Sequence, residues 1–119
     1  MKITVRSEGR AGVRSGKPYA IRKLRSSFDR ISRNIRSIDL LLLDANGPRG
    51  GIDKVSRIAV DLGRHKILRL EGIGRTVPES VNTTVDRAKR LVSRSLSRGR
   101  EGRKEAGRRA ASASRRASR

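Results

Sequence analysis

The sequence predicts an α+β fold with elements in the order β-α-β-β-β-α, forming a four-stranded sheet with two helices on one face. Two long stretches place an apolar residue at every third or fourth position, which is the spacing of a helix with one buried side. Four shorter stretches are continuous or alternating in apolar residues, as strands are. A chain of 119 residues is long enough for one small domain, which we expect over residues 1–97.

The N-terminal third is predicted to contain one strand and one helix. Residues 2–6 alternate apolar and polar side chains, which suits a short strand. Residues 7–16 include three glycines and show no periodicity, so we expect a loop there. Residues 17–35 are predicted to be helical because Pro18 suits a first turn and five apolar residues form one stripe: Ile21, Leu24, Phe28, Ile31 and Ile35.

Three further strands are expected at residues 38–43, about 52–62 and 66–71. Asn46-Gly47 and Gly50-Gly51 indicate the first turn between them and residues 63–65 the second, so these strands form an antiparallel meander. Because a helix follows the first strand, we expect that strand to pair parallel to a neighbour. The two helices then lie side by side on one face of the sheet.

The last element is predicted to be a helix that begins near Thr76 and is followed by a basic tail. Thr76, with Glu79 three residues later, matches a capping box. An apolar stripe follows at Val81, Val85, Ala88, Val92 and Leu96. Residues 98–119 hold nine Lys or Arg and two Glu, a net charge of +7 that leaves +13 on residues 1–97. With few apolar side chains to offset its ordering entropy, this tail is expected to be disordered in the free protein.

The formal net charge of +20, from 31 Lys or Arg against 11 Asp or Glu, indicates a polyanionic partner. Basic helix faces are often merely solvated, but here the acidic residues are too few to pair with most of the cations. A membrane surface is disfavoured because the chain has one Phe, one Tyr and no Trp. The same shortage leaves little to stack on single-stranded bases, so we expect binding through phosphates and shape that weakens steeply with salt.

No convincing catalytic, metal or cofactor site is apparent in the sequence. The chain has no Cys, and its single histidine, His65, falls in a turn, where a surface position is the default. The glycine-rich turn fails as a phosphate-binding P-loop because it leads into a strand instead of a helix. The carboxylates that could bind a metal stand in strands or turns, where Asp commonly bonds the local backbone: Asp39, Asp44, Asp53 and Asp61. We expect no enzymatic activity, metal, cofactor or small-molecule substrate.

Neither a membrane span nor an export signal is expected. The longest purely apolar run, residues 40–43, is far too short to cross a bilayer. Residues 1–6 contain no apolar signal region. Together with the absence of Cys, this favours a cytoplasmic protein.

Several motifs of the chain occur together in one known family. The strongest is the glycine-rich turn with its flanks, Leu43-Asp44-Ala45-Asn46-Gly47-Pro48-Arg49-Gly50-Gly51-Ile52-Asp53-Lys54. Others are Phe28-Asp29-Arg30-Ile31, Arg57-Ile58-Ala59-Val60, Glu71 and Val85-Asp86-Arg87-Ala88. Over about residues 28–98 the chain resembles the ribosome hibernation-promoting factor family, also called the ribosome-associated inhibitor or sigma-54 modulation family.

The resemblance implies a fold akin to double-stranded-RNA-binding domains. It also implies a cytoplasmic stress factor that acts at the ribosome. Such a factor binds the small ribosomal subunit between head and body, occupies the mRNA and tRNA path, and silences idle ribosomes. The rRNA-binding residues that it implies are Arg22, Lys23, Arg25, Arg30, Arg33, Arg87, Lys89, Arg90 and Arg94. Secondary contacts are expected at Arg49, Lys54 and Arg98, and the free protein is expected to be a monomer.

The chain departs from the family pattern at several places. Residues 74–78 stand where relatives commonly have an acidic-aromatic segment, and Ser56 stands where a cysteine is frequent. No second, dimerising domain follows, so we do not expect it to pair ribosomes through such a domain.

Two other functions stay open at this point. The chain could be a general RNA- or DNA-binding architectural protein that uses its basic helices and its Arg/Ser tail. It could also be an enzyme, for which the only candidates are His65 and scattered carboxylates.

Overall fold

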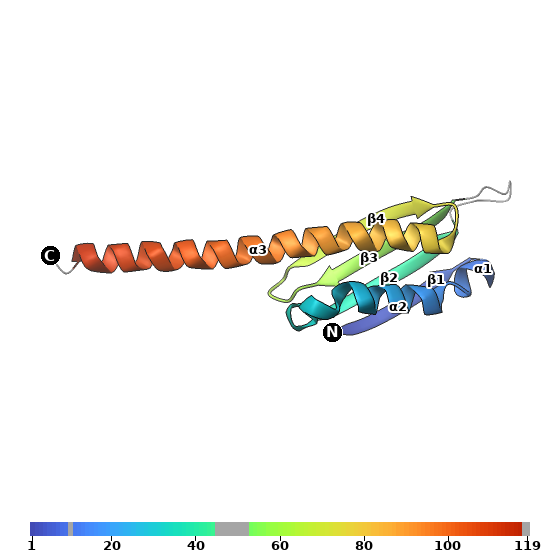
Figure 1. The fold of residues 1–119 in the computed structure, drawn as a ribbon, viewed down its shortest axis with the longest axis horizontal. Helices are drawn as coiled ribbons and strands as arrows, with labels where there is room; N and C mark the ends of the chain where they lie inside the picture. The colour runs from blue at the N-terminus through green and yellow to red at the C-terminus, as the bar shows by residue number, and fades with distance from the viewer. Residues whose placement is uncertain (10, 45–52, 118–119) are drawn as a thin grey trace.

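The computed structural model describes residues 1–9, 11–44 and 53–117, with side chains described for residues 1–9, 13–44 and 53–98 (Figure 1). The glycine-rich turn and Arg49 therefore lie outside the described residues. The elements are β1 (Lys2–Glu8), α1 (Ala11–Arg14), α2 (Lys17–Phe28), the 3₁₀ helix η1 (Asp29–Asn34), β2 (Ser37–Asp44), β3 (Lys54–Asp61), β4 (Ile67–Gly74) and α3 (Val77–Ala117).

The four strands form one sheet in the order β1-β2-β3-β4. The pair β1–β2 is parallel, with Val5 opposite Leu40, whereas β2–β3 and β3–β4 are antiparallel, with Ile58 opposite both Leu40 and Leu70. Figure 1 shows α2 and α3 together on one face of this sheet. The predicted α+β order, the parallel first pair and the meander are thus confirmed.

The core lies between the sheet and the helices. Alternate residues of β2 and β3 point toward the helices and are buried, including Ile38, Leu40 and Val60. From the helices, Leu24 and Phe28 of α2 meet the same cluster, along with a row from α3: Val77, Val81, Val85, Ala88 and Val92. Burial of this apolar area is the main stabilising contribution to the domain.

Small residues let α3 lie close against β3 and β4. A Cβ atom built at Gly74 would collide with the backbone nitrogen of Ser80 and lie 2.9 Å from the carbonyl carbon of Glu79. At Gly72 it would collide with the hydroxyl of Thr84. Buried hydroxyls complete the contact, since Ser56 Oγ and Ser80 Oγ are 2.6 Å apart and Thr84 Oγ1 donates to the Ser80 carbonyl at 2.8 Å.

The N-terminal region is more ordered than the sequence predicts. In place of a loop over residues 7–16, β1 continues to Glu8 and the short helix α1 follows. The reason is Val13, which is fully buried in the core and holds this segment against the sheet. Val13 is the single large apolar residue among residues 7–16, and one such residue shows no periodicity that could predict its burial.

The first long helix is shorter than predicted. It ends at Phe28, and residues 29–34 continue as 3₁₀ helix with a break at Ile31, whose φ of −113° and ψ of 15° are not helical. Ile35 is buried but has an extended backbone, with φ −116° and ψ 124°. Apolar spacing of three or four residues fits both helix types, so the stripe alone does not separate them.

The last helix begins as predicted and extends further. Thr76 Oγ1 accepts the Glu79 N–H at 3.2 Å, whereas the Glu79 carboxylate accepts the N–H of Arg75 at 3.3 Å, one residue earlier than in a capping box. The helix continues to Ala117 and projects past the sheet (Figure 1). Ala, Arg, Lys and Glu are strong helix formers, and residues 98–117 contain no Pro. The domain boundary at residue 97 and the disorder of the free tail stay predictions.

We predict that Gly74→Ala destabilises the domain, because the new methyl group meets backbone atoms of α3 that cannot rotate away. The expected loss in free energy of unfolding is about 1–3 kcal/mol, measured by urea denaturation. Ser93→Ala, at an exposed position of α3, is the control and should change stability by less than about 0.5 kcal/mol. Equal stability of Gly74→Ala and the unmodified protein would contradict the close approach.

Candidate nucleic-acid interface

Three arginines of α3 lie together on the side of the helix that overhangs β4. Arg87, Arg90 and Arg94 are spaced by three and four residues and are exposed on one side of the helix. They line a shallow depression of about 320 Å³ with Leu70, Glu71 and Leu91. Leu91 is 38% exposed, so this surface combines three cations with one apolar side chain. It presents several guanidinium groups to one stretch of a polyanion.

The opposite side of α3 faces α2 and is held by polar contacts. The hydroxyl of Tyr19 donates to Asn82 Oδ1, and Lys23 Nζ lies 3.1 Å from Asp86 Oδ1. Lys89 follows Asp86 by three residues, so it lies on this same side of the helix. Lys23, with a side chain 27% exposed, is therefore engaged between the helices, and its direct contact with RNA stays a prediction.

The remaining predicted residues continue the cationic surface across α2 and η1. Arg22 and Arg25 are exposed on α2, as are Arg30 and Arg33 on η1. Arg25 lines a depression of about 330 Å³ near the N-terminus with Met1, Ile3, Asp29 and Ser32. The predicted cations thus surround the helix layer from the β1 side to the β4 edge and do not form a single ridge.

Of the predicted secondary contacts, Lys54 is engaged within the fold. Its ammonium lies 3.0 Å from Asp44 Oδ2, with side chains 22% and 7% exposed, across the β2–β3 pair. Arg98 is exposed on α3. Arg49 lies outside the described residues.

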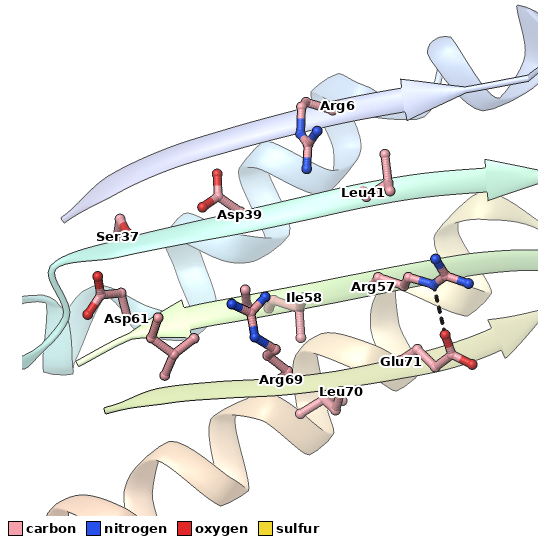
Figure 2. A pocket seen from close by; sticks show the side chains of 12 residues that line it. Arg6, Ser37, Asp39, Leu41, Arg57, Ile58, Asp61, Arg69, Leu70 and Glu71 are labelled. Atoms are coloured by element: carbon pink, nitrogen blue, oxygen red, sulfur yellow. Dashed lines mark hydrogen bonds and ion pairs between the residues drawn. The ribbon is translucent and has the colours of Figure 1, made fainter. Parts of the chain in front are cut away.

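The face of the sheet away from the helices is mixed in charge (Figure 2). By strand alternation it carries four cations, Lys2, Arg6, Arg57 and Arg69, and four anions, Glu8, Asp39, Asp61 and Glu71. Figure 2 shows Arg57 directed at Glu71, with Nε 2.9 Å from Oε2. A broad hollow of about 630 Å³ runs over this face, with Leu41, Ala59 and Ile67 among its lining residues.

The two faces of the domain therefore differ in net charge. The strand residues of the open face sum to zero, so the +20 of the chain lies elsewhere, on the helix layer, the loops and the tail. A polyanion is attracted to the helix layer and finds no net attraction on the open sheet face.

The turn between β3 and β4 adds basic residues that the sequence analysis did not place in the site. Arg64, His65 and Lys66 are all exposed there. The exposed position of His65 is the one predicted for it. The available signal was the composition of the turn, since Arg and Lys flank His65 where turn-forming residues are usual.

The described part of the chain contains neither a cluster of metal-ligating side chains nor a membrane-spanning helix. No group of three or more His, Asp or Glu side chains within it could hold a metal ion. None of its helices is long and apolar enough to cross a membrane.

Solved structures share the fold described above. A ribosomal subunit interface protein from Coxiella burnetii matches with a TM-score of 0.64 at 13% sequence identity, covering 82% of this chain and 99% of that chain. The N-terminal domain of Protein Y from Thermus thermophilus matches with a TM-score of 0.58 at 20% identity, covering 79% of this chain and 98% of that chain. No protein-family profile and no curated protein matches the sequence. The structural likeness confirms the predicted fold.

We predict that Tyr19→Phe loosens the contact between the two helices, because Asn82 loses its hydroxyl donor. The expected loss of stability is about 0.5–1.5 kcal/mol, measured by chemical denaturation. A double-mutant cycle with Asn82→Ala isolates the pair, and additive effects of the two substitutions would contradict a direct interaction.

Proposed function

We propose that the protein is a ribosome-binding factor of the hibernation-promoting type. It binds rRNA of the small subunit, occupies the mRNA and tRNA path, and inhibits translation without enzymatic activity. It acts in the cytoplasm as a monomer. The observation that carries the proposal is a helix layer surrounded by cations on a fold shared with a ribosomal subunit interface protein, opposite a sheet face of zero net strand charge.

The chemistry of the surface supports RNA over a protein or small-molecule partner. Arg87, Arg90 and Arg94 are side by side on a helix that packs closely against the sheet, so the spacing of their backbone positions is set before binding. Each phosphate that they neutralise releases condensed counterions, which favours association. The single Tyr is bonded to Asn82, leaving recognition to phosphates and shape.

Inhibition follows from occupancy and needs no catalytic group. A domain docked by its helix layer excludes other ligands from the volume that it fills. Its affinity then sets the fraction of ribosomes blocked. Because that affinity depends on released counterions, salt and competing polyanions control it.

We predict that the chain co-sediments with small subunits and 70S ribosomes in sucrose gradients at low salt. Substituting Arg87, Arg90 and Arg94 by Gln should weaken this binding. It should also make the fall of log affinity with log salt less steep, reducing the magnitude of the slope by about 2–3. The matched control substitutes Lys2, Arg6 and Arg69 by Gln, removing the same charge from the open sheet face. Absence of the unmodified chain from both ribosomal fractions would overturn the proposal.

A second candidate, a general RNA- or DNA-binding architectural protein, is favoured by the length of α3. The helix continues to Ala117, and its residues 98–117 carry a net charge of +6, which could bind any duplex.

Truncation after residue 97 separates the two functions. If the first is right, we predict that residues 1–97 still bind ribosomes in preference to free duplexes, with affinity lowered by the lost charge. Equal affinity of the full chain for ribosomes and free duplexes, abolished by truncation, would instead support the architectural function. Both affinities can be measured by filter binding at two salt concentrations.

A further inference from the structure

The turn between β3 and β4 has an uncommon backbone conformation. Gly63, Arg64 and His65 have φ values of 77°, 53° and 63°, three successive residues on the left-handed side. Glycine adopts such angles without steric penalty, but Arg and His do not. Tight hairpin turns that require positive φ usually contain Asn and Gly at these positions. Here the central pair is Arg-His.

Surrounding hydrogen bonds hold this turn in place. The Gly63 N–H donates to Asp61 Oδ1 at 2.8 Å, and the Lys66 N–H donates to the Gly63 carbonyl at 3.0 Å. The Leu62 N–H donates to the Lys66 carbonyl at 2.9 Å, closing the hairpin. Strained residues persist in folds when their neighbours determine them in this way, and they cluster at functional sites.

The turn presents its cations at the end of the domain where other cations already lie. The Arg36 N–H donates to the Asp61 carbonyl at 2.7 Å, which places the connection after η1 beside the base of the turn. Figure 1 shows the β3–β4 turn at the same end of the sheet as η1 and as the point where α3 projects beyond it. Arg33 and Arg36 of one segment and Arg64 and Lys66 of the other are exposed there.

We propose that this β3–β4 tip, residues 63–66, is a further phosphate-contacting site that extends the helix-layer surface around the end of the domain. That the partner is a ribosome rests on the proposed function. That the ligand is an RNA phosphate backbone does not depend on it. The strained turn directs two cations outward where Asn-Gly would give a more relaxed turn with no charge. Stability is exchanged for an electrostatic contact.

Two variants test the tip. In the first, Arg64→Asn with His65→Gly relaxes the backbone and removes one charge. Its thermal midpoint should rise, while its affinity for isolated small subunits should fall about threefold to tenfold at low salt. In the second, Arg64→Gln with Lys66→Gln removes two charges, and the salt slope should fall by about 1–2.

The matched control, Arg6→Gln with Arg69→Gln, removes two charges from the open sheet face and should change affinity less than about twofold. If the tip variants match this control while substitution of Arg87, Arg90 and Arg94 still weakens binding, the tip proposal is overturned and the proposed function stands. If the unmodified chain fails to bind small subunits, the proposed function fails. In that case the affinity of the same variants for a free RNA duplex tests whether the tip contacts phosphates, and unchanged affinity overturns the tip proposal.

Discussion

The close approach of α3 to β4 determines where the cations of the protein lie. Gly72 and Gly74 leave no side chain between strand and helix, and the hydroxyls of Ser56, Ser80 and Thr84 fill the remaining space. The helix is thereby pressed onto the sheet along its first turns, which points its apolar stripe inward. Its arginines at every third or fourth position then overhang the β4 edge. A bulky residue at either glycine would lift the helix and turn the arginine row away.

Strand alternation and helix coverage together produce the charge separation. The strands send their apolar residues toward the helices, and their opposite faces carry equal numbers of cations and anions. The helices cover the apolar face, and their exposed residues include more cations than anions. Contacts such as Lys23–Asp86 and Tyr19–Asn82 bring the two helices into one layer in spite of their shared positive charge.

The fold could be predicted from the sequence because its elements are periodic, whereas much of the candidate site could not. The stripes of α2 and α3 and the alternation around Leu40 suffice to predict the order and the layers. Single anchors such as Val13 have no period, and a change from α to 3₁₀ helix at Phe28 leaves the apolar spacing unchanged. Composition indicates a polyanion partner, but cannot show that Lys23 and Lys54 are engaged within the fold. The turn at residues 63–65 could be predicted, but its left-handed backbone could not, because Arg and His are not typical of that conformation.

A sheet face of zero net charge behind a cationic helix layer makes the molecule behave as an electric dipole in solution. In the field of a nucleic acid such a body experiences a torque as well as an attraction, and it turns before it touches. Collisions are then biased toward the binding-competent orientation, which raises the association rate without any change in the contacts finally made. The range of this alignment is set by the Debye length, about 8 Å at physiological ionic strength. The protein therefore selects its orientation only within the last few water layers of its target.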